Sequence, residues 1–349
     1  MPSHPLRIGV VGTTPYAETH MSRIAAHPGA QLAAVAGRDE SRASEVAARN
    51  GIPSVHRGFE EMLDTRTIDA VVVVAPDELH EAITTAAFEA GIHVLCEKPL
   101  ARTPQEAHRM AQAAQASGLV NMSYFALRTS PHHRYLRDLL DDGAIGTIRS
   151  ATFSLAHGFF RSPEYNWRFD SSRGGGVVAD LGCYVFDLAR WYVGDIKSVA
   201  ANGKSQVQRP RPDGIPYSPA DDSCVGALTF TEGAHATFEL SVLSQVGAGR
   251  QRNTVHLQGD GGRLELTHTF AGSTLRGVRG DRDDFEEIAL PVDYDSPSGD
   301  AEFIDAILAG VSVRPDFVDG WRVQQVVAAA EKAAHSGEWI DVKEEETRI

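Results

Sequence analysis

Short apolar runs alternate with amphipathic stretches over the first third of the chain. Buried strands are predicted at residues 6–11, 31–36, 69–75, 93–96 and 119–124, and the run DAVVVVA at 69–75 is typical of a central parallel strand covered on both faces. Helical patterns lie between them at residues 17–26, 41–50, 78–90 and 104–117, with Thr103 as an N-cap and Gly51, Gly91 and Gly118 as stops. This alternation predicts βαβ units in a doubly wound parallel sheet, an α/β Rossmann domain over residues 1–123.

A different pattern follows residue 123. Strands are predicted at residues 148–156, 196–205, 223–230, 234–243, 254–258 and 262–266, and several alternate polar and apolar positions, as antiparallel strands with one solvated face do. Helices are predicted at residues 130–141, 178–192, 299–309 and 319–336, and residues 208–222, with four prolines, predict a loop. Residues 124–349 are therefore expected to form an α+β domain with one open, mainly antiparallel sheet, used for substrate binding and oligomerisation.

Composition narrows the functional class. A chain of 349 residues is long enough for two cores, and no apolar run reaches the length of about 18 residues that a membrane helix needs. The net charge of −14 argues against nucleic acid and anionic membranes as partners. Three scattered cysteines argue against disulfides and a structural zinc site, so no metal is expected. The polar start of the chain leads directly into a strand, which predicts a cytoplasmic protein without a signal peptide.

The turn after the first strand is a candidate phosphate loop. Gly12 fills the first glycine position of a dinucleotide fingerprint, Thr14 replaces the second glycine and Ala17 the third, with Thr13 and Tyr16 between them. Thr14 is expected either to displace the pyrophosphate outward or to bind it through its hydroxyl group. The loop alone fits a tight turn without ligand equally well, but its place on the first strand of a doubly wound sheet favours a nucleotide at the helix N-terminus.

The end of the second strand bears on the choice of cofactor. Gly37 stands where NAD-binding proteins usually place an acidic residue for the ribose, and Arg38 follows it. Without a carboxylate to repel the 2′-phosphate, and with a guanidinium to bind it, NADP(H) is favoured over NAD(H). In the alternative, Arg38 is a solvated surface charge and Asp39 binds the ribose.

Three motifs carry a resemblance to a known family. They are APDELH at residues 75–80, CEKPL at residues 96–100, and GGG at residues 174–176 leading to DLGCY at residues 180–184. Together they resemble the glucose–fructose oxidoreductase, inositol dehydrogenase and rhizopine catabolism (Gfo/Idh/MocA) family, and the resemblance extends to residues 303–339. It implies an NAD(P)-dependent enzyme that acts on sugars, inositols and related polyols.

The resemblance also implies roles for single residues. Lys98 matches the lysine beside the nicotinamide and the substrate hydroxyl, where a cation stabilises a developing alkoxide. Asp180 matches an aspartate that contacts substrate, and Tyr184 stands where many relatives have a histidine acid/base. A tyrosine at this place resembles the branch of glucose–fructose oxidoreductase, xylose dehydrogenase and dihydrodiol dehydrogenase, whereas Asp187 and the following residues 188–191 (LARW) resemble the inositol branch. The remaining cofactor contacts are expected from Ala75, Pro76, Leu79, His80 and Glu97, although a structural hydrogen bond from His80 to a loop is an equal alternative.

Asp180 and Tyr184 are four residues apart, so a helix would project both from one face, and Asp187 could join them. Alternatively, Asp180 caps the helix and Tyr184 belongs to the core. Substrate contacts are also expected from Arg128, His157, Trp167 and Arg168, for which a hinge salt bridge or aromatic packing are the alternatives.

These observations predict an NADP(H)-dependent oxidoreductase that transfers a hydride to or from a secondary alcohol or ketone of a sugar, inositol or related polyol. Two rival hypotheses remain: a redox-assisted glycosidase or eliminase with tightly bound cofactor, and a non-catalytic NADP-binding sensor. The open sheet of the C-terminal domain must be covered, and self-association is usual in the family, so a homodimer or homotetramer is expected.

Overall fold

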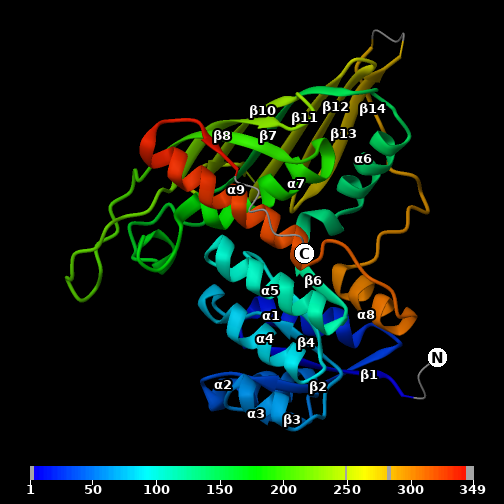
Figure 1. The fold of residues 1–349 in the computed structure, drawn as a ribbon, viewed down its shortest axis with the longest axis vertical. Helices are drawn as coiled ribbons and strands as arrows, with labels where there is room; N and C mark the ends of the chain where they lie inside the picture. Colours follow the sequence, from blue (N-terminus) through cyan, green and yellow to red (C-terminus); the bar gives the residue numbers. More distant parts are fainter. Residues whose placement is uncertain (1–3, 248–249, 281–283, 343–349) are drawn as a thin grey trace. The chain divides into compact units, whose positions relative to one another are not determined.

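The computed structural model of the protein describes residues 4–247, 250–280 and 284–342, which divide into two compact units (Figure 1). The first unit combines residues 4–126 with 297–324, and the second combines residues 127–296 with 325–342. The boundary expected at residue 123 placed residues 297–324 in the second domain, whereas they group with the first. The reason is that helix α8 (Gly299–Ala309) buries Phe303 and Ile304 in the core of the first unit.

The first unit is built on a parallel sheet. Among the described residues it has six strands in the order β3-β2-β1-β4-β5-β6, namely β1 (Leu6–Val11), β2 (Ala30–Ala36), β3 (Ser54–His56), β4 (Ala70–Val73), β5 (His93–Glu97) and β6 (Asn121–Tyr124). Its helices are α1 (Pro15–Ala25), α2 (Glu40–Asn50), α3 (Phe59–Asp64), α4 (His80–Glu89) after the 3-10 turn η1 (Asp77–Leu79), and α5 (Pro104–Ser117). The predicted Rossmann fold is confirmed, although β3 and α3 were not predicted.

Each face of this sheet carries its own hydrophobic core, because successive side chains of a strand point to opposite faces. On β4, Val71 and Val73 pack with α3, α4 and α5, while Ala70 and Val72 pack with α1, α2 and α8. The almost continuously apolar sequence of β4 follows from this two-sided burial. The carboxyl ends of β1 and β2 then present the predicted phosphate loop and ribose positions at one edge of the sheet.

The second unit is built on a mixed sheet. Its described residues give nine strands in the order β14-β13-β12-β11-β7-β10-β9-β8-β15, and every pair is antiparallel except β7 with β10. The strands are β7 (Ile148–His157), β8 (Ile196–Lys204), β9 (Ser223–Phe230), β10 (His235–Ser241), β11 (Gln251–Gly259), β12 (Gly262–Thr269), β13 (Gly272–Arg279), β14 (Glu286–Glu287) and β15 (Ile340–Asp341). The mainly antiparallel sheet is thus confirmed, and β13, β14 and β15 extend it beyond the predicted strands.

Helices α6 (Pro131–Asp141) and α7 (Cys183–Val193) lie on one face of this sheet (Figure 1). The short helical turns η2 (Ala126–Thr129), η3 (Trp167–Phe169) and η4 (Val178–Gly182) lie in the connecting segments, and α9 (Phe317–Ser336) runs from the first unit into the second. No helix of the described residues is both long and apolar enough to cross a membrane.

Candidate functional site

The phosphate loop connects β1 to α1. Gly12 has a φ of +139°, and a Cβ atom there would overlap the carbonyl oxygen of Val74, so only glycine fits this position. Thr14 is the N-cap of α1, and its Oγ1 accepts a hydrogen bond from the backbone N–H of Ala17 at 3.2 Å. The hydroxyl hydrogen of Thr14 remains able to donate to a phosphate at the positive end of the helix dipole.

The ribose position lies at the end of β2. A Cβ atom on Gly37 would come within 2.7 Å of the Thr13 side chain, so the residue has little room for an acidic side chain. Arg38 is exposed, and the Asp39 side chain caps α2 by accepting a hydrogen bond from the backbone N–H of Arg42 at 3.1 Å. Arg42 reaches back to the phosphate loop, where its Nε donates to the Thr13 carbonyl oxygen at 2.9 Å. Two arginines, Arg38 and Arg42, therefore follow the ribose position closely in the chain.

A buried ionic cluster supports the Glu-Lys-Pro motif of β5. His20 is fully buried and faces Asp300 through Nδ1 at 2.6 Å and Glu97 through Nε2 at 3.0 Å. Burial alone would lower the pKa of His20, but the hydrogen bonds and charges of Asp300 and Glu97 raise it to about 9. Glu97 also accepts a hydrogen bond from the backbone N–H of Lys98 at 3.2 Å, so the cluster fixes the backbone at Lys98.

His80 connects two loops of the same unit. Its Nε2 lies 3.0 Å from the Ala75 carbonyl oxygen, and its Nδ1 lies 3.0 Å from the carbonyl oxygen of Pro99. The ring is buried, and the Lys98–Pro99 peptide bond is cis. His80 thus holds the loop after β4 against the loop that follows Lys98, which is the structural alternative considered for it.

Asp180 and Tyr184 lie at the start of a long helical segment in the second unit. The segment opens with the π-helical turn η4, which carries Asp180, and continues as α7, which carries Tyr184. Leu181, Cys183 and Val185 between and beside them are buried, whereas Asp180 and Tyr184 are only partly buried. Both side chains therefore project from the less buried face, and π-turns of this kind are frequent at functional sites.

The start of this helical segment is held by hydrogen bonds to Asp221, a residue outside the segment. The backbone N–H of Val177 donates to the carbonyl oxygen of Asp221 at 2.9 Å, and the N–H of Val178 donates to the Asp221 carboxylate at 3.2 Å. Gly176 has a φ of +63°, and a Cβ atom there would lie 2.8 Å from Asp221 Oδ1. A Cβ atom on Gly175 would overlap Glu331 of α9. The side chains of Asp221 and Glu331 thus pack directly against the glycine motif at residues 174–176.

These two carboxyl groups titrate abnormally. Burial raises the pKa of Asp221 to about 6. Burial, and then the charge of Asp221, raise the pKa of Glu331 to about 7, while His335 lowers it by less. The summed charge of Asp221 and Glu331, which pack against the glycine motif, therefore changes near neutral pH.

Arginine and aromatic side chains surround Asp180. Arg168 Nε lies 3.9 Å from Asp180 Oδ1, and its guanidinium lies 4.6 Å from the centre of the Trp167 ring. Phe160 lies under the same guanidinium at 5.9 Å and contacts the ring of His157 at a centroid distance of 5.7 Å. The predicted substrate residues His157, Trp167 and Arg168 thus form one connected group with Asp180.

Arg128 occupies a different environment. It forms a two-point ion pair with Asp187, with Nε to Oδ2 at 2.8 Å and Nη2 to Oδ1 at 2.6 Å, and its guanidinium lies 5.0 Å from the Trp191 ring centre. Asp187 is 1 % exposed, so it is held in a buried pair rather than on the face of Asp180 and Tyr184.

The predicted site residues fall into two groups. The first unit holds the phosphate loop, the ribose corner, the His80 loops and Lys98, and the second unit holds Asp180, Tyr184 and the Arg168 group. Arg42 and Asp221 were not predicted from the sequence. A basic residue in the first turn of the helix after β2 was the available signal for Arg42, whereas Asp221 lies in a proline-rich stretch and has no local signal.

The first unit suits a dinucleotide. A glycine that admits no Cβ atom begins the loop, the N-terminus of α1 follows it, and Arg42 of α2 contacts the loop at Thr13. Gly12, Thr13, Thr14, Tyr16 and Ala17 would hold the pyrophosphate side of such a cofactor.

Comparison with known proteins agrees with this assignment. Residues 6–125 match the oxidoreductase family with an NAD-binding Rossmann fold, and residues 133–265 match the GFO/IDH/MocA C-terminal domain. The chain is 29 % identical to levoglucosan dehydrogenase of Pseudarthrobacter phenanthrenivorans, with 88 % of each chain covered. It is 31 % identical to D-xylose 1-dehydrogenase (NADP(+)) 2 of Haloferax volcanii, with 69 % of each chain covered.

A solved structure of levoglucosan dehydrogenase in complex with NADH and levoglucosan is similar over the whole fold. Its TM-score is 0.89 at 26 % identity, with 97 % of this chain and 100 % of that chain covered. Matches to both domains and these relatives show that the chain belongs to the Gfo/Idh/MocA family and is an NAD(P)-dependent dehydrogenase or reductase acting on CH–OH groups.

Proposed function

We propose that the protein catalyses reversible hydride transfer between NADP(H) and a secondary carbinol carbon of a sugar, inositol or related polyol. The observation that carries the proposal is the partly buried pair Asp180 and Tyr184, which projects from a segment whose neighbouring side chains are buried. When bound, the nicotinamide supplies the hydride chemistry at its C4 atom. The protein binds the substrate and moves the proton.

Each catalytic residue has one role in this proposal. During oxidation Tyr184 takes the proton of the reacting hydroxyl group as the C–H bond gives up its hydride. Lys98 stabilises the negative charge that develops on the substrate oxygen. Asp180 accepts a hydrogen bond from a neighbouring hydroxyl group, and Arg168, 3.9 Å away, keeps its carboxylate in place.

Three residues support NADP(H) over NAD(H). Gly37 removes the carboxylate that would repel a 2′-phosphate, and Arg38 and Arg42 offer guanidinium groups at the same corner. Asp39, the alternative ribose ligand, already uses an oxygen to cap α2. The xylose dehydrogenase relative, whose name specifies NADP(+), is consistent with this choice.

Nicotinamide absorbance measured with NADP⁺ or NAD⁺ and a panel of anhydrosugars, pentoses, hexoses and inositols tests the proposal. At least one substrate should be oxidised, with a higher kcat/KM for NADP⁺. Cofactor binding without turnover of any substrate would overturn the proposed activity. Turnover without net cofactor reduction would instead favour the redox-assisted eliminase.

Self-association through the nine-stranded sheet is part of the proposal. On β9 and β10 the side chains facing away from the core are accessible, and Val225 is 56 % exposed. Covering this face with a second copy would bury Val225, so Val225→Arg should lower the oligomeric mass measured by light scattering. A monomeric wild-type protein would contradict this part of the proposal.

A further inference from the structure

His20 of α1 lies between two carboxylates that belong to distant parts of the chain. Its Nδ1 lies 2.6 Å from Asp300 Oδ1 on α8, and its Nε2 lies 3.0 Å from Glu97 Oε1 at the end of β5. All three side chains are buried within the first unit. The cluster therefore joins the first helix, the fifth strand and helix α8.

Both ring nitrogens of His20 face a carboxylate oxygen within hydrogen-bond distance. A neutral imidazole has one N–H group, so it can donate a hydrogen bond to only one of two ionised carboxylates, whereas an imidazolium donates to both. This geometry therefore favours a positively charged ring between Asp300 and Glu97. The raised pKa of His20, about 9, agrees with that charge at neutral pH.

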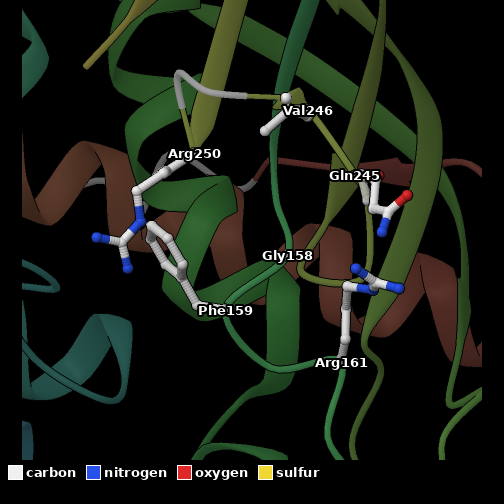
Figure 2. Close-up of a pocket in the computed structure, with 8 residues that line it drawn as sticks. Gly158, Phe159, Arg161, Gln245, Val246 and Arg250 are labelled. Atoms are coloured by element: carbon white, nitrogen blue, oxygen red, sulfur yellow. The ribbon is translucent and has the colours of Figure 1, made fainter. Parts of the chain in front are cut away.

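Burial strengthens the attraction between His20 and Glu97. Figure 2 shows the opposite case in the second unit, where the exposed side chains of Arg161 and Arg250 border a hollow. Water and salt screen such exposed charges, but they screen a fully buried ring far less. Loss of the His20 charge should therefore act directly on the Glu97 carboxylate.

Glu97 extends this interaction to Lys98. While Oε1 faces His20, Oε2 accepts a hydrogen bond from the backbone N–H of Lys98 at 3.2 Å. On the other side, Nδ1 of His80 lies 3.0 Å from the carbonyl oxygen of Pro99, the residue after Lys98. A cation at one oxygen orients the whole carboxylate, so His20 determines where Glu97 binds the Lys98 N–H.

Several elements place titratable or charged side chains around His20. They are Tyr16 and Arg23 on α1, Glu97 on β5, Tyr124 on β6 and Asp300 on α8. The Tyr16 ring, in the first turn of α1 after the phosphate loop, meets the His20 ring edge-on at a centroid distance of 5.4 Å. The cluster thus contacts the start of α1 on one side and, through Glu97, the backbone of Lys98 on the other.

We infer that His20 is a positioning residue for Lys98: by holding Glu97, it fixes the Lys98 backbone where the lysine side chain acts on the substrate oxygen. The inference rests on the proposed function for the role of Lys98 in turnover. It adds that kcat depends on a buried histidine that the proposed mechanism does not otherwise use.

Turnover by H20Q, assayed where circular dichroism shows that the variant is folded, is the first test. Its kcat should fall about 10- to 100-fold, because a small displacement of a catalytic group costs that much, while the Kd for the cofactor changes little. In the K98A background H20Q should have almost no further effect. H27Q is the control, since His27 follows α1 and pairs at the surface with Asp305 of α8 at 3.1 Å. A wild-type kcat for H20Q, or the same fold-loss with and without Lys98, would overturn the inference.

D300N and D305N provide a second test, which leaves His20 in place and decides the matter if H20Q does not fold. D300N removes one of the carboxylates that stabilise the His20 cation, so the ring should lose its proton, and the enzyme its activity, at a lower pH than in the wild type. D305N, at the exposed partner of His27, should leave the pH profile of kcat unchanged. Coinciding profiles for D300N and D305N would contradict the inference.

Lys98 itself is observable without turnover. The chain has five lysines, so reductive methylation with ¹³C-formaldehyde gives few NMR signals, and K98A identifies that of Lys98. This signal should shift in H20Q and keep its wild-type position in H27Q; an unshifted signal in H20Q would refute the positioning role. A signal that shifts only in H20Q, in a protein that oxidises no substrate, supports the positioning role and counts against the proposed function. Turnover of a sugar that is equal in wild type and H20Q refutes the positioning role alone.

Discussion

The carboxylate of Asp221 accepts a hydrogen bond from the backbone N–H of Val178 at 3.2 Å. Val178 opens the segment that carries Asp180 and Tyr184, so a residue before β9 holds the first turn of the proposed catalytic segment. Glu331 lies against the preceding glycine motif, and its charge is unfavourable beside Asp221.

Glu331→Gln should stabilise the protein at alkaline pH. Burial and Asp221 raise the pKa of Glu331 in the folded protein to about 7 from its ordinary value of 4.5, so stability is lost as the pH rises through this window. The variant should gain roughly 1–3 kcal/mol of unfolding free energy at pH about 8 and little at pH about 4.5. Melting curves at both pH values measure this gain, with Glu338→Gln as the exposed control. A gain of the same size at both pH values would contradict the account.

His20 should make stability fall at alkaline pH as well. Its pKa in the folded protein, raised to about 9 by Asp300 and Glu97, exceeds the ordinary histidine value of 6.5, so its contribution to stability is complete below about 6.5 and lost as the pH passes 9. His20→Gln should cost about 3–5 kcal/mol at neutral pH, because it removes the cation between two buried carboxylates and leaves Asp300 only the longer ion pair with Arg23 at 3.5 Å. Chemical denaturation across this pH range should also show that the unfolding free energy of His20→Gln varies less with pH than that of His27→Gln. An unchanged slope in His20→Gln would refute the assigned charge.

Arg38 and Arg42 should decide cofactor preference. Arg38→Ala and Arg42→Ala should each raise KM for NADP⁺ by about tenfold, because each loses a charge-assisted hydrogen bond to the 2′-phosphate, and should leave KM for NAD⁺ nearly unchanged. Arg57→Gln, an exposed arginine of the same unit, is the control. Equal effects on both cofactors would show that these residues do not read the 2′-phosphate.

Tyr184 should govern proton transfer. Tyr184→Phe should lower kcat about 10²- to 10⁴-fold while cofactor binding persists, because the ring remains and only the hydroxyl is lost. Tyr184→His should restore part of the activity and move the pH profile toward acid, since histidine ordinarily titrates near about 6.5 and tyrosine near about 10. A Phe variant with wild-type kcat would exclude Tyr184 as the acid/base.

Local sequence patterns predicted most of the helices and strands, because buried apolar positions recur with a different spacing in a helix than in a strand. The strand at 223–230 and the helices at 104–117 and 299–309 were predicted with the bounds observed, and Thr103 caps its helix as predicted. The packing partner of α8 could not be predicted, because an amphipathic helix does not reveal which core it covers. The π-turn at Val178–Gly182 was likewise not predicted, because its start is held by backbone N–H groups that donate hydrogen bonds to the distant Asp221.

Turnover by Lys98→Ala tests the central claim, NADP(H)-dependent oxidation or reduction of a sugar or polyol, most directly. The account predicts that kcat falls on the order of 10³-fold with any substrate that the wild-type enzyme oxidises, while the dissociation constant for NADP⁺ changes little. Substantial turnover by the Lys98→Ala variant, with cofactor binding intact, would contradict it.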